Sequence, residues 1–311
     1  MDTNILLESG TNELEILEFK IADNYYGINV AKIREILTYQ HVTPVPNSHP
    51  FVEGIFMPRD TIISVINLRK CLGYEDLPAG KGLFFITNFN NLNTAFHVDE
   101  VLGIHRVSWE AINTPDSTIS AEDTAVATGV LKLDDHLVVI IDFEKIVSNI
   151  NPETGLKVSD MDSYQKDEEK DRSKAPLVVA EDSPLLSKLI VDCLNKAGYT
   201  NLHVFPNGKE AWDFMCEKKE GGTVLQDCHC IITDIEMPQM DGHRFCKLVK
   251  DDEKMRAIPV IIFSSLINDD IRRKGESVGA DAQLTKPEIG KLVDAIDGLV
   301  DKYEDARRKA S

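Results

Sequence analysis

The sequence predicts a two-domain protein, with an all-β domain in the N-terminal half followed by an α/β domain that has a parallel sheet. In the C-terminal half, short apolar runs alternate with segments of helical periodicity, which is typical of parallel strands joined by helices. In the N-terminal half, short strand patterns are separated by turns, which indicates one or two β-barrels. Between the halves, residues 151–174 lack apolar periodicity, and 311 residues are enough for two domains.

Three apolar runs and a fourth candidate strand in the C-terminal half define the expected parallel strands. They are Leu177–Ala180, Ile231–Thr233, Val260–Phe263 and Asp281–Thr285. We expect a helix directly after the first run, because Ser183 is a favourable N-cap and Pro184 suits the first helical position, where a missing N–H costs nothing. Gly198 suits the C-terminal end of that helix.

Polar residues stand at the ends of these runs: Glu181 and Asp182, then Asp234, then Ser264, then Lys286. Ligands of parallel α/β sheets bind outside the carboxyl ends of the strands, so we expect these side chains to converge on one cleft. Carboxylate oxygens are the ligands that Mg²⁺ prefers, and three neighbouring acids without a cation would repel one another. The sequence therefore predicts a site for Mg²⁺ and phosphate.

The residue types at this site predict phosphoryl transfer to an aspartate. With the metal bound, Asp234 can stay ionised and attack phosphorus, which gives an aspartyl phosphate. Lys286 would neutralise charge on the side opposite the metal, and Ser264 can donate a hydrogen bond to a phosphoryl oxygen. The expected metal ligands are the carboxylates of Glu181, Asp182 and Asp234 and the backbone carbonyl of Glu236.

Composition argues against several other kinds of function. The formal net charge is −18, and the acidity is spread over both halves, whereas a nucleic-acid partner would require a basic face. No run approaches 18 consecutive apolar residues and the N-terminus lacks a secretory signal, so no membrane insertion is expected. Six scattered cysteines suit a reducing cytoplasm. Cys228-His229-Cys230 lacks the usual paired-cysteine spacing, so buried packing is favoured over zinc binding.

The N-terminal half contains six strand patterns, and the first two give a hairpin signal. They are Glu15–Ile21, Asn24–Val30, Thr61–Asn67, Gly82–Asn88, Asn93–Asp99 and His136–Asp142. Short strands dense with turns predict a barrel or a pair of barrels. The half has no nucleophile elbow, no zinc-protease motif and no glycine-rich phosphate loop, so we interpret it as a binding module.

The boundary between the two halves is marked by a change in composition. Asn151-Pro152, Gly155 and the charged run from Lys166 to Lys174 replace the apolar periodicity. Such a composition cannot bury enough surface to order itself, so residues 151–174 are expected to be a flexible linker. The predicted domains are then residues 12–150 and 175–305.

Residues 177–303 resemble a response-regulator receiver domain, which accepts phosphate from a histidine kinase. The matching motifs are Glu181-Asp182, Asp234 to Pro238, Met240-Asp241-Gly242, Ser264 and Lys286-Pro287. The resemblance implies a flavodoxin-like fold, in which five helices flank a five-stranded parallel sheet. It also implies that Asp234 is the phosphorylation site, Asp182 a direct ligand of Mg²⁺ and Glu181 a water-mediated one.

Two positions depart from the common receiver pattern. Gln283 stands where many receivers have an aromatic switch residue, three positions before the lysine, so we expect output through another surface or through the loop after Ser264. Ser265 stands where alanine or glycine is more usual. Its extra atoms are expected to narrow access to the phosphoryl group and to slow autodephosphorylation, with a contribution from Glu236.

Residues 12–150 resemble the CheW-like coupling domain of bacterial chemotaxis. The matching stretches are Phe19–Val30, Ile33–Ile36, Val42–Pro46, Val52–Phe56, Arg59 with Ile63–Leu68, Val98–Leu102 and Val138–Phe143. The resemblance implies two small five-stranded barrels that bridge chemoreceptor tips to the histidine kinase CheA. The family's usual Arg-Gly pair is Arg59-Asp60 here, so the glycine is replaced. The resemblance implies that Arg59 contacts a partner. The alternative is a surface arginine paired with Glu53 or Asp60.

A coupling domain followed by a receiver resembles the CheV family of chemotaxis proteins. This implies a non-enzymatic cytoplasmic adaptor, associated with membrane receptor arrays, in which CheA phosphorylates Asp234 and thereby supports adaptation or drains phosphate. Two alternatives remain open: a response regulator that acts chiefly as a phosphate sink, and one with an enzymatic output such as a methylesterase. The missing nucleophile elbow counts against the enzyme.

Overall fold

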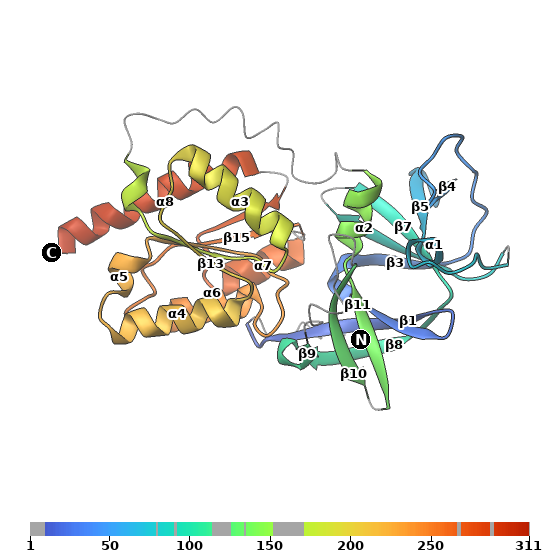
Figure 1. Cartoon of the computed structure of the whole chain (residues 1–311), viewed down its shortest axis with the longest axis horizontal. Helices are drawn as coiled ribbons and strands as arrows, with labels where there is room; N and C mark the ends of the chain where they lie inside the picture. Colours follow the sequence, from blue (N-terminus) through green and yellow to red (C-terminus); the bar gives the residue numbers. More distant parts are fainter. Residues whose placement is uncertain are drawn as a thin grey trace. The chain divides into compact units, whose positions relative to one another are not determined.

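The computed structural model describes residues 10–78, 80–89, 92–113, 126–133, 135–151, 171–265, 269–286 and 289–310. The chain divides into two compact units, Leu14–Gly155 and a second one that joins Met1–Glu13 to Leu156–Ser311 (Figure 1). Most of the predicted linker, residues 152–170, lies outside the described residues. The domain limits 12–150 and 175–305 therefore stay predictions.

The unit Leu14–Gly155 contains two sheets, as expected for an all-β domain. One sheet has the strand order β8-β1-β2-β11-β10-β9 and consists of β1 (Glu13–Ile21), β2 (Asn24–Asn29), β8 (Glu100–Ser108), β9 (Ile112–Asn113), β10 (Ala127–Leu133) and β11 (His136–Ile141). The other has the order β3-β6-β7-β5-β4 and consists of β3 (Ile33–Thr38), β4 (Val52–Phe56), β5 (Ile63–Asn67), β6 (Leu83–Phe89) and β7 (Leu92–Val98). The first sheet thus has one strand more than the five expected, because the two-residue strand β9 pairs with β10.

The six strands predicted in this half are all present, and their ends agree with the prediction within two residues. Helices are short: α1 (Leu68–Cys71), α2 (Phe143–Ile150) and the 3₁₀ turns η1 (Val30–Lys32) and η2 (Trp109–Ala111). Aromatic rings from both sheets and from α2 share one core. Phe19 of β1 meets Phe85 of β6 edge-on at 5.1 Å between ring centroids, and Phe96 of β7 meets Phe143 of α2 at 4.7 Å.

The other unit has a parallel five-stranded sheet with the order β13-β12-β14-β15-β16. Its strands are β12 (Leu177–Ala180), β13 (Leu202–Phe205), β14 (Cys230–Thr233), β15 (Val260–Ser264) and β16 (Ala282–Thr285). Its helices are α3 (Pro184–Ala197), α4 (Gly208–Glu220), α5 (Val224–Asp227), α6 (Gly242–Asp251), α7 (Asp269–Ser277) and α8 (Ile289–Ala310), preceded by the 3₁₀ turn η5 (Arg172–Lys174). The predicted flavodoxin-like architecture is confirmed, with the four-residue helix α5 in addition to the five helices expected.

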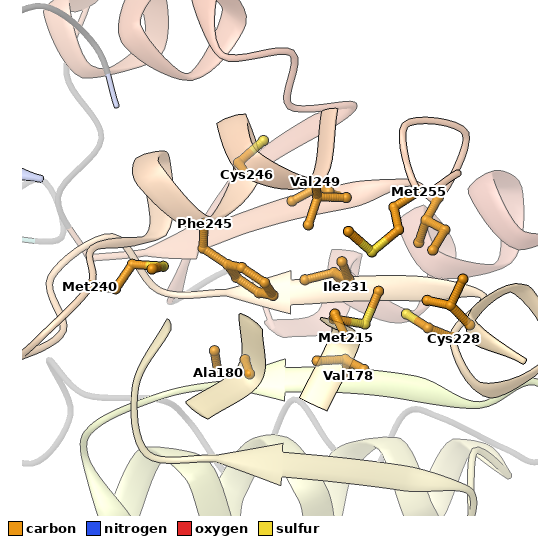
Figure 2. Close-up of a cluster of buried hydrophobic side chains, with 14 of the residues drawn as sticks. Val178, Ala180, Met215, Cys228, Ile231, Met240, Phe245, Cys246, Val249 and Met255 are labelled. Carbon is orange, nitrogen blue, oxygen red and sulfur yellow. The ribbon is translucent and has the colours of Figure 1, made fainter. Parts of the chain in front are cut away.

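Helices cover both faces of this sheet (Figure 1). Helices α3 and α8 pack on one face, where Ile190 and Ile296 join a buried cluster with Val179 of β12. Helices α4 and α6 pack on the other face, and Figure 2 shows α6 side chains such as Phe245 packed over Ile231 of β14. Neighbouring residues of a strand point to opposite faces, so a strand buried on both faces is apolar throughout, as the predicted run Leu177–Ala180 is.

The predicted ends of α3 are also confirmed. Ser183 caps the helix by accepting a hydrogen bond from the backbone N–H of Leu186, Pro184 occupies the first turn, and Gly198 ends the helix with a φ of 103°. A residue with a side chain adopts this left-handed conformation only with strain, which is why glycine suits the position. None of the helices in the described parts of the chain is long and apolar enough to cross a membrane.

Candidate functional site

The sheet register gathers the polar strand-end residues at one edge. Ala180 of β12 pairs with Thr233 of β14, and Ser264 of β15 pairs with Thr285 of β16, all in parallel strands. The residues that follow these strands therefore leave the sheet on the same side. The strand-end positions read from the sequence thus translate into a shared location in the fold.

Lys286 forms the centre of this cluster. Its Nζ lies 2.8 Å from Oδ2 of Asp234 and 3.0 and 3.2 Å from the two carboxylate oxygens of Glu181. Lys286, Asp234 and Glu181 are 5%, 6% and 3% exposed. A buried ammonium between two carboxylates is stabilised only when such pairing compensates for the loss of hydration.

The backbone around Asp234 fixes its orientation. The backbone N–H of Ile235 donates to Oδ1 of Asp234 at 2.7 Å, and the N–H of Asp234 donates to the carbonyl of Ala180 at 2.9 Å. Gly242, the first residue of α6, lies so close to the carbonyl oxygen of Asp234 that a Cβ at position 242 would come within 1.9 Å of it. The start of α6 and the strand-end aspartate are thus in direct contact.

Negative charge accumulates at this edge of the sheet. Glu181, Asp182 and Asp234 each offer a carboxylate oxygen, and these oxygens lie within 4.8 Å of one another. Burial, together with the neighbouring charge of Asp234, raises the pKa of Glu181 to about 7 although Lys286 opposes the shift. The positive charge of Lys286 alone therefore does not offset the negative charge of the three carboxylates, and their oxygens fit a hard divalent cation such as Mg²⁺.

The other predicted site residues lie in or beside the same edge. Ser264 is 1% exposed and Ser265 is 7% exposed, at the end of β15. Glu236 is half-buried in the loop that leads from Asp234 to α6. The loop after Ser265 and Pro287, two further parts of the prediction, lie outside the described residues.

Gln283, the residue that replaces the usual aromatic switch, packs against α7. Its Nε2 donates to the carbonyl of Arg272 at 2.8 Å, and a Cβ on Gly275 would meet its Oε1 at 2.3 Å. The amide therefore joins β16 to α7 through a polar contact with the helix backbone. This contact requires the close approach that Gly275 allows.

Arg59 lies apart from this cluster, in the other unit, in the connection between β4 and β5. Its side chain is 81% exposed and forms an ion pair with Glu35 of β3, not with Glu53 or Asp60 as one alternative expected. Glu53 instead pairs with His97 at 2.8 Å. Arg59 itself has the left-handed φ of 61°, whereas Asp60 is not among the residues with positive φ. The backbone at position 60, where the family usually has glycine, therefore does not need a glycine in this protein.

One residue of this region was not predicted as functional, although its motif was noted. Asp241 caps α6 by accepting a hydrogen bond from the N–H of Arg244 at 2.7 Å, and burial raises its pKa to about 6. The signal in the sequence is an N-cap aspartate directly before a glycine at the start of a helix.

The cysteines of the Cys228-His229-Cys230 run are buried in the core, and among the described residues the only group with metal-binding geometry is the acidic cluster.

Comparison with known proteins agrees with both domain predictions. Residues 15–151 match the CheW-like domain family, and residues 177–297 match the response regulator receiver domain family. The chemotaxis protein CheV3 of Helicobacter pylori is 28% identical and covers 94% of this chain and 96% of its own length. The chemotaxis protein CheW of Thermotoga maritima is 29% identical, covering 48% of this chain and 98% of its own length. Among solved structures, the scaffolding protein TtCheW of Thermoanaerobacter tengcongensis is 27% identical, with a TM-score of 0.39, over 42% of this chain and 84% of its own.

The chain is thus a two-domain signalling protein, with a CheW-like domain followed by a receiver domain. Three CheV proteins of Helicobacter pylori match between 88% and 94% of its length. The chain thus has the CheW-like and receiver domain order that its sequence predicted, and it is similar to these CheV proteins over most of its length.

Proposed function

We propose that this protein is a chemotaxis adaptor that couples chemoreceptors to the histidine kinase CheA through its CheW-like domain. Phosphorylation of Asp234 in the receiver would regulate this coupling. The observation that carries the proposal is the buried cluster of Asp234, Glu181 and Lys286 in a chain whose other domain is CheW-like. An adaptor of this kind has no catalytic output of its own and acts in the cytoplasm beside receptor arrays.

The chemistry at Asp234 follows from its contacts. An oxygen of the Asp234 carboxylate attacks the phosphorus of a phosphohistidine in CheA, an O–P bond forms, and the P–N bond breaks with its electron pair returning to the imidazole. Lys286, 2.8 Å from Oδ2, stabilises charge on the transferred group. Ser264, buried at the end of β15, would donate a hydrogen bond to a phosphoryl oxygen.

Mg²⁺ is the cofactor that the donor set favours. The carboxylates of Asp182 and Asp234 would bind it directly, Glu181 through a water, and the carbonyl of Glu236 would complete the protein ligands. When bound, the ion neutralises the charge that develops on the phosphoryl oxygens. Two hard carboxylate ligands plus waters suit Mg²⁺ better than zinc, which favours nitrogen and sulfur ligands.

Arg59 is the proposed partner contact of the CheW-like domain. Its 81% exposed side chain leaves the guanidinium accessible at a surface turn. The ion pair with Glu35 is weak opposition to a partner, because exposed pairs contribute about 0–1 kcal/mol. An acidic group on a receptor or on CheA could therefore replace Glu35.

Two measurements test the proposal. Transfer of labelled phosphate from phospho-CheA to the full chain should require Mg²⁺ and vanish in Asp234→Asn, whereas Asp192→Asn, an exposed carboxylate of α3, should label normally. Labelling that persists in Asp234→Asn would place the phosphorylation site elsewhere. In receptor arrays reconstituted without CheW, the protein should restore receptor control of CheA; if it only drains phosphate from CheA, it is a sink and the adaptor proposal fails.

A response regulator with an enzymatic output is disfavoured by the way the two domains fill the chain. The longest stretch outside the two matched ranges is residues 152–176, which is too short for a catalytic domain. The two matched domains, the receiver and the CheW-like domain, are therefore the proposed route of signalling output.

A further inference from the structure

The N-terminal residues Gly10–Asn12 pack against the receiver and belong to the same compact unit. Nδ2 of Asn12 donates to the carbonyl of Gln239 at 2.8 Å, and the N–H of Asp241 donates to Oδ1 of Asn12 at 3.0 Å. Nη1 of Arg244 donates to the carbonyl of Gly10 at 3.1 Å. We call residues 10–12 the N-terminal strap.

The strap is a specific contact and not a loose end of the chain. Asn12 is only 7% exposed, and its single amide group satisfies one acceptor and one donor of the loop backbone. Gly10 is buried with a φ of 76°, and a Cβ there would meet Cδ of Lys247 at 2.6 Å. A glycine and an asparagine two positions apart are therefore both required by this geometry.

The strap binds the loop that starts at the phosphoacceptor. This loop runs from Asp234 to α6, and the N–H of Gly242 donates to the carbonyl of Ile235 at 2.9 Å across its base. Met240, between the two residues that Asn12 contacts, is buried in the core cluster shown in Figure 2. A shift at Asp234 is therefore transmitted to Gln239 and Asp241 instead of being absorbed by a soft loop.

The observed position of the strap corresponds to an unmodified aspartate. Oδ1 of Asp234 accepts from Ile235 and Oδ2 is paired with Lys286, so a phosphoryl group on either oxygen must displace one of these contacts. It also brings a charge of about −1.5 to −2 to the start of the loop. The two hydrogen bonds of Asn12 require a fixed spacing of loop groups, and hydrogen bonds weaken steeply when their angles change.

We propose that the loop of residues 235–241 is the docking surface for the N-terminal strap, and that phosphorylation of Asp234 releases it. Asn12 is followed directly by β1 (Glu13–Ile21), which supplies Phe19 to the core of the CheW-like domain. Release of the strap thus frees the chain segment that leads into that strand. This inference rests on the proposed phosphorylation of Asp234 and names the route by which it acts.

The release can be measured by hydrogen–deuterium exchange on the full-length protein, with Mg²⁺ and beryllofluoride as the phosphoryl mimic. Backbone amides of residues 10–13 should exchange about 10- to 30-fold faster with the mimic. This is the effect of losing the two hydrogen bonds by which the Asn12 side chain holds the strap to the loop. Asn12→Asp keeps the shape and the acceptor but turns an oxygen toward the carbonyl of Gln239. It should exchange fast without the mimic and no faster with it.

A second variant and a matched control separate release of the strap from damage to the receiver. Gly10→Ala should also exchange fast, because its Cβ collides with Lys247 outside the receiver core. Asn201→Asp, an exposed asparagine of the same unit, should behave as wild type. Because coupling is reciprocal, Asn12→Asp should bind beryllofluoride about 10-fold more tightly than wild type.

The possible outcomes distinguish this inference from the proposed function. If beryllofluoride changes exchange in residues 235–241 while residues 10–13 stay protected, the strap does not respond and the inference is wrong. If beryllofluoride changes neither segment, the phosphoacceptor assignment itself fails, and the strap mechanism with it. If Asn12→Asp exchanges as slowly as wild type, the amide contacts do not hold the strap.

Discussion

Replacement of Lys286 by methionine tests the electrostatics of the site. Lys286→Met keeps most of the aliphatic volume but removes the charge that lies within 3.2 Å of both Asp234 and Glu181. Removal of one partner from a buried ion pair destabilises proteins by about 3–5 kcal/mol, because the other charge stays buried and uncompensated. We expect this full loss only where Glu181 is ionised.

The stability lost in Lys286→Met should be larger at high pH than at low pH. The pKa of Glu181 is raised from 4.5 to about 7 in the folded protein, so its contribution to stability is present below pH 4.5 and is lost as the pH rises through about 7. At pH 6 most Glu181 is already protonated, and the variant loses mainly its contact to Asp234, about 1.5–3 kcal/mol for a charged hydrogen bond. At pH 8 the loss should reach about 3–5 kcal/mol.

Magnesium should rescue the variant more than the wild type. Without the ammonium group, a divalent cation no longer meets a positive neighbour, and each tenfold gain in affinity adds about 1.4 kcal/mol of stability at saturating metal. Urea unfolding can be followed by the fluorescence of Trp212 in a Trp109→Phe background, with and without Mg²⁺ at pH 6 and 8. An equal loss at both pH values, with no larger rescue by Mg²⁺, would refute this account of the cluster.

Two further predictions concern other parts of the chain. Gly242→Ala should lower the free energy of unfolding by about 1–3 kcal/mol and slow phosphorylation of Asp234 at least about tenfold, because its Cβ would lie 1.9 Å from a backbone oxygen. Gly298→Ala is the control, since its Cβ would meet nothing within 4 Å. Denaturation measures the stability of both variants, and phosphate labelling measures their phosphorylation. Burial alone would lower the pKa of His97, but its hydrogen bonds to Glu53 and to a backbone carbonyl raise it above 6.5. Stability of the CheW-like domain should therefore fall as the pH rises from about 6.5, by at most about 1.4 kcal/mol per unit, and His97→Gln should remove this slope in thermal melts at pH 6–8.

The receiver could be predicted from the sequence because its signals are local. A strand buried on both faces is a continuous apolar run, and its last residue marks the edge of the sheet where ligands bind. Glu181 and Asp234 could be placed in this way without knowing any contact, whereas Lys286 follows a less apolar strand pattern that is only half-buried. The edge strand β13 (Leu202–Phe205) was not predicted, because it is only partly buried and lacks such a run.

The CheW-like domain was harder to predict in detail for the same reason. Strands β3 and β8 alternate between half-buried and exposed residues, so their apolar signal is weak. The ion pair of Arg59 with Glu35 joins the connection between β4 and β5 to strand β3, and neither spacing nor charge in the sequence distinguishes Glu35 from Glu53. Local periodicity thus locates strands, whereas pairing across strands depends on register, which the sequence does not state directly.

The strap was not predictable at all, since Asn12 and Asp241 lie 229 positions apart in the chain. Its importance follows from a substitution that the sequence did reveal. With Gln283 hydrogen-bonded to the backbone of α7 over Gly275, β16 and α7 are joined by a contact that a rotating aromatic ring could not make. A conformational change at Asp234 is then transmitted to the CheW-like domain by another route. Among the described segments, the loop from Asp234 to Asp241 contacts the phosphoacceptor through Ile235 and contacts Asn12, the residue that precedes β1, through Asp241.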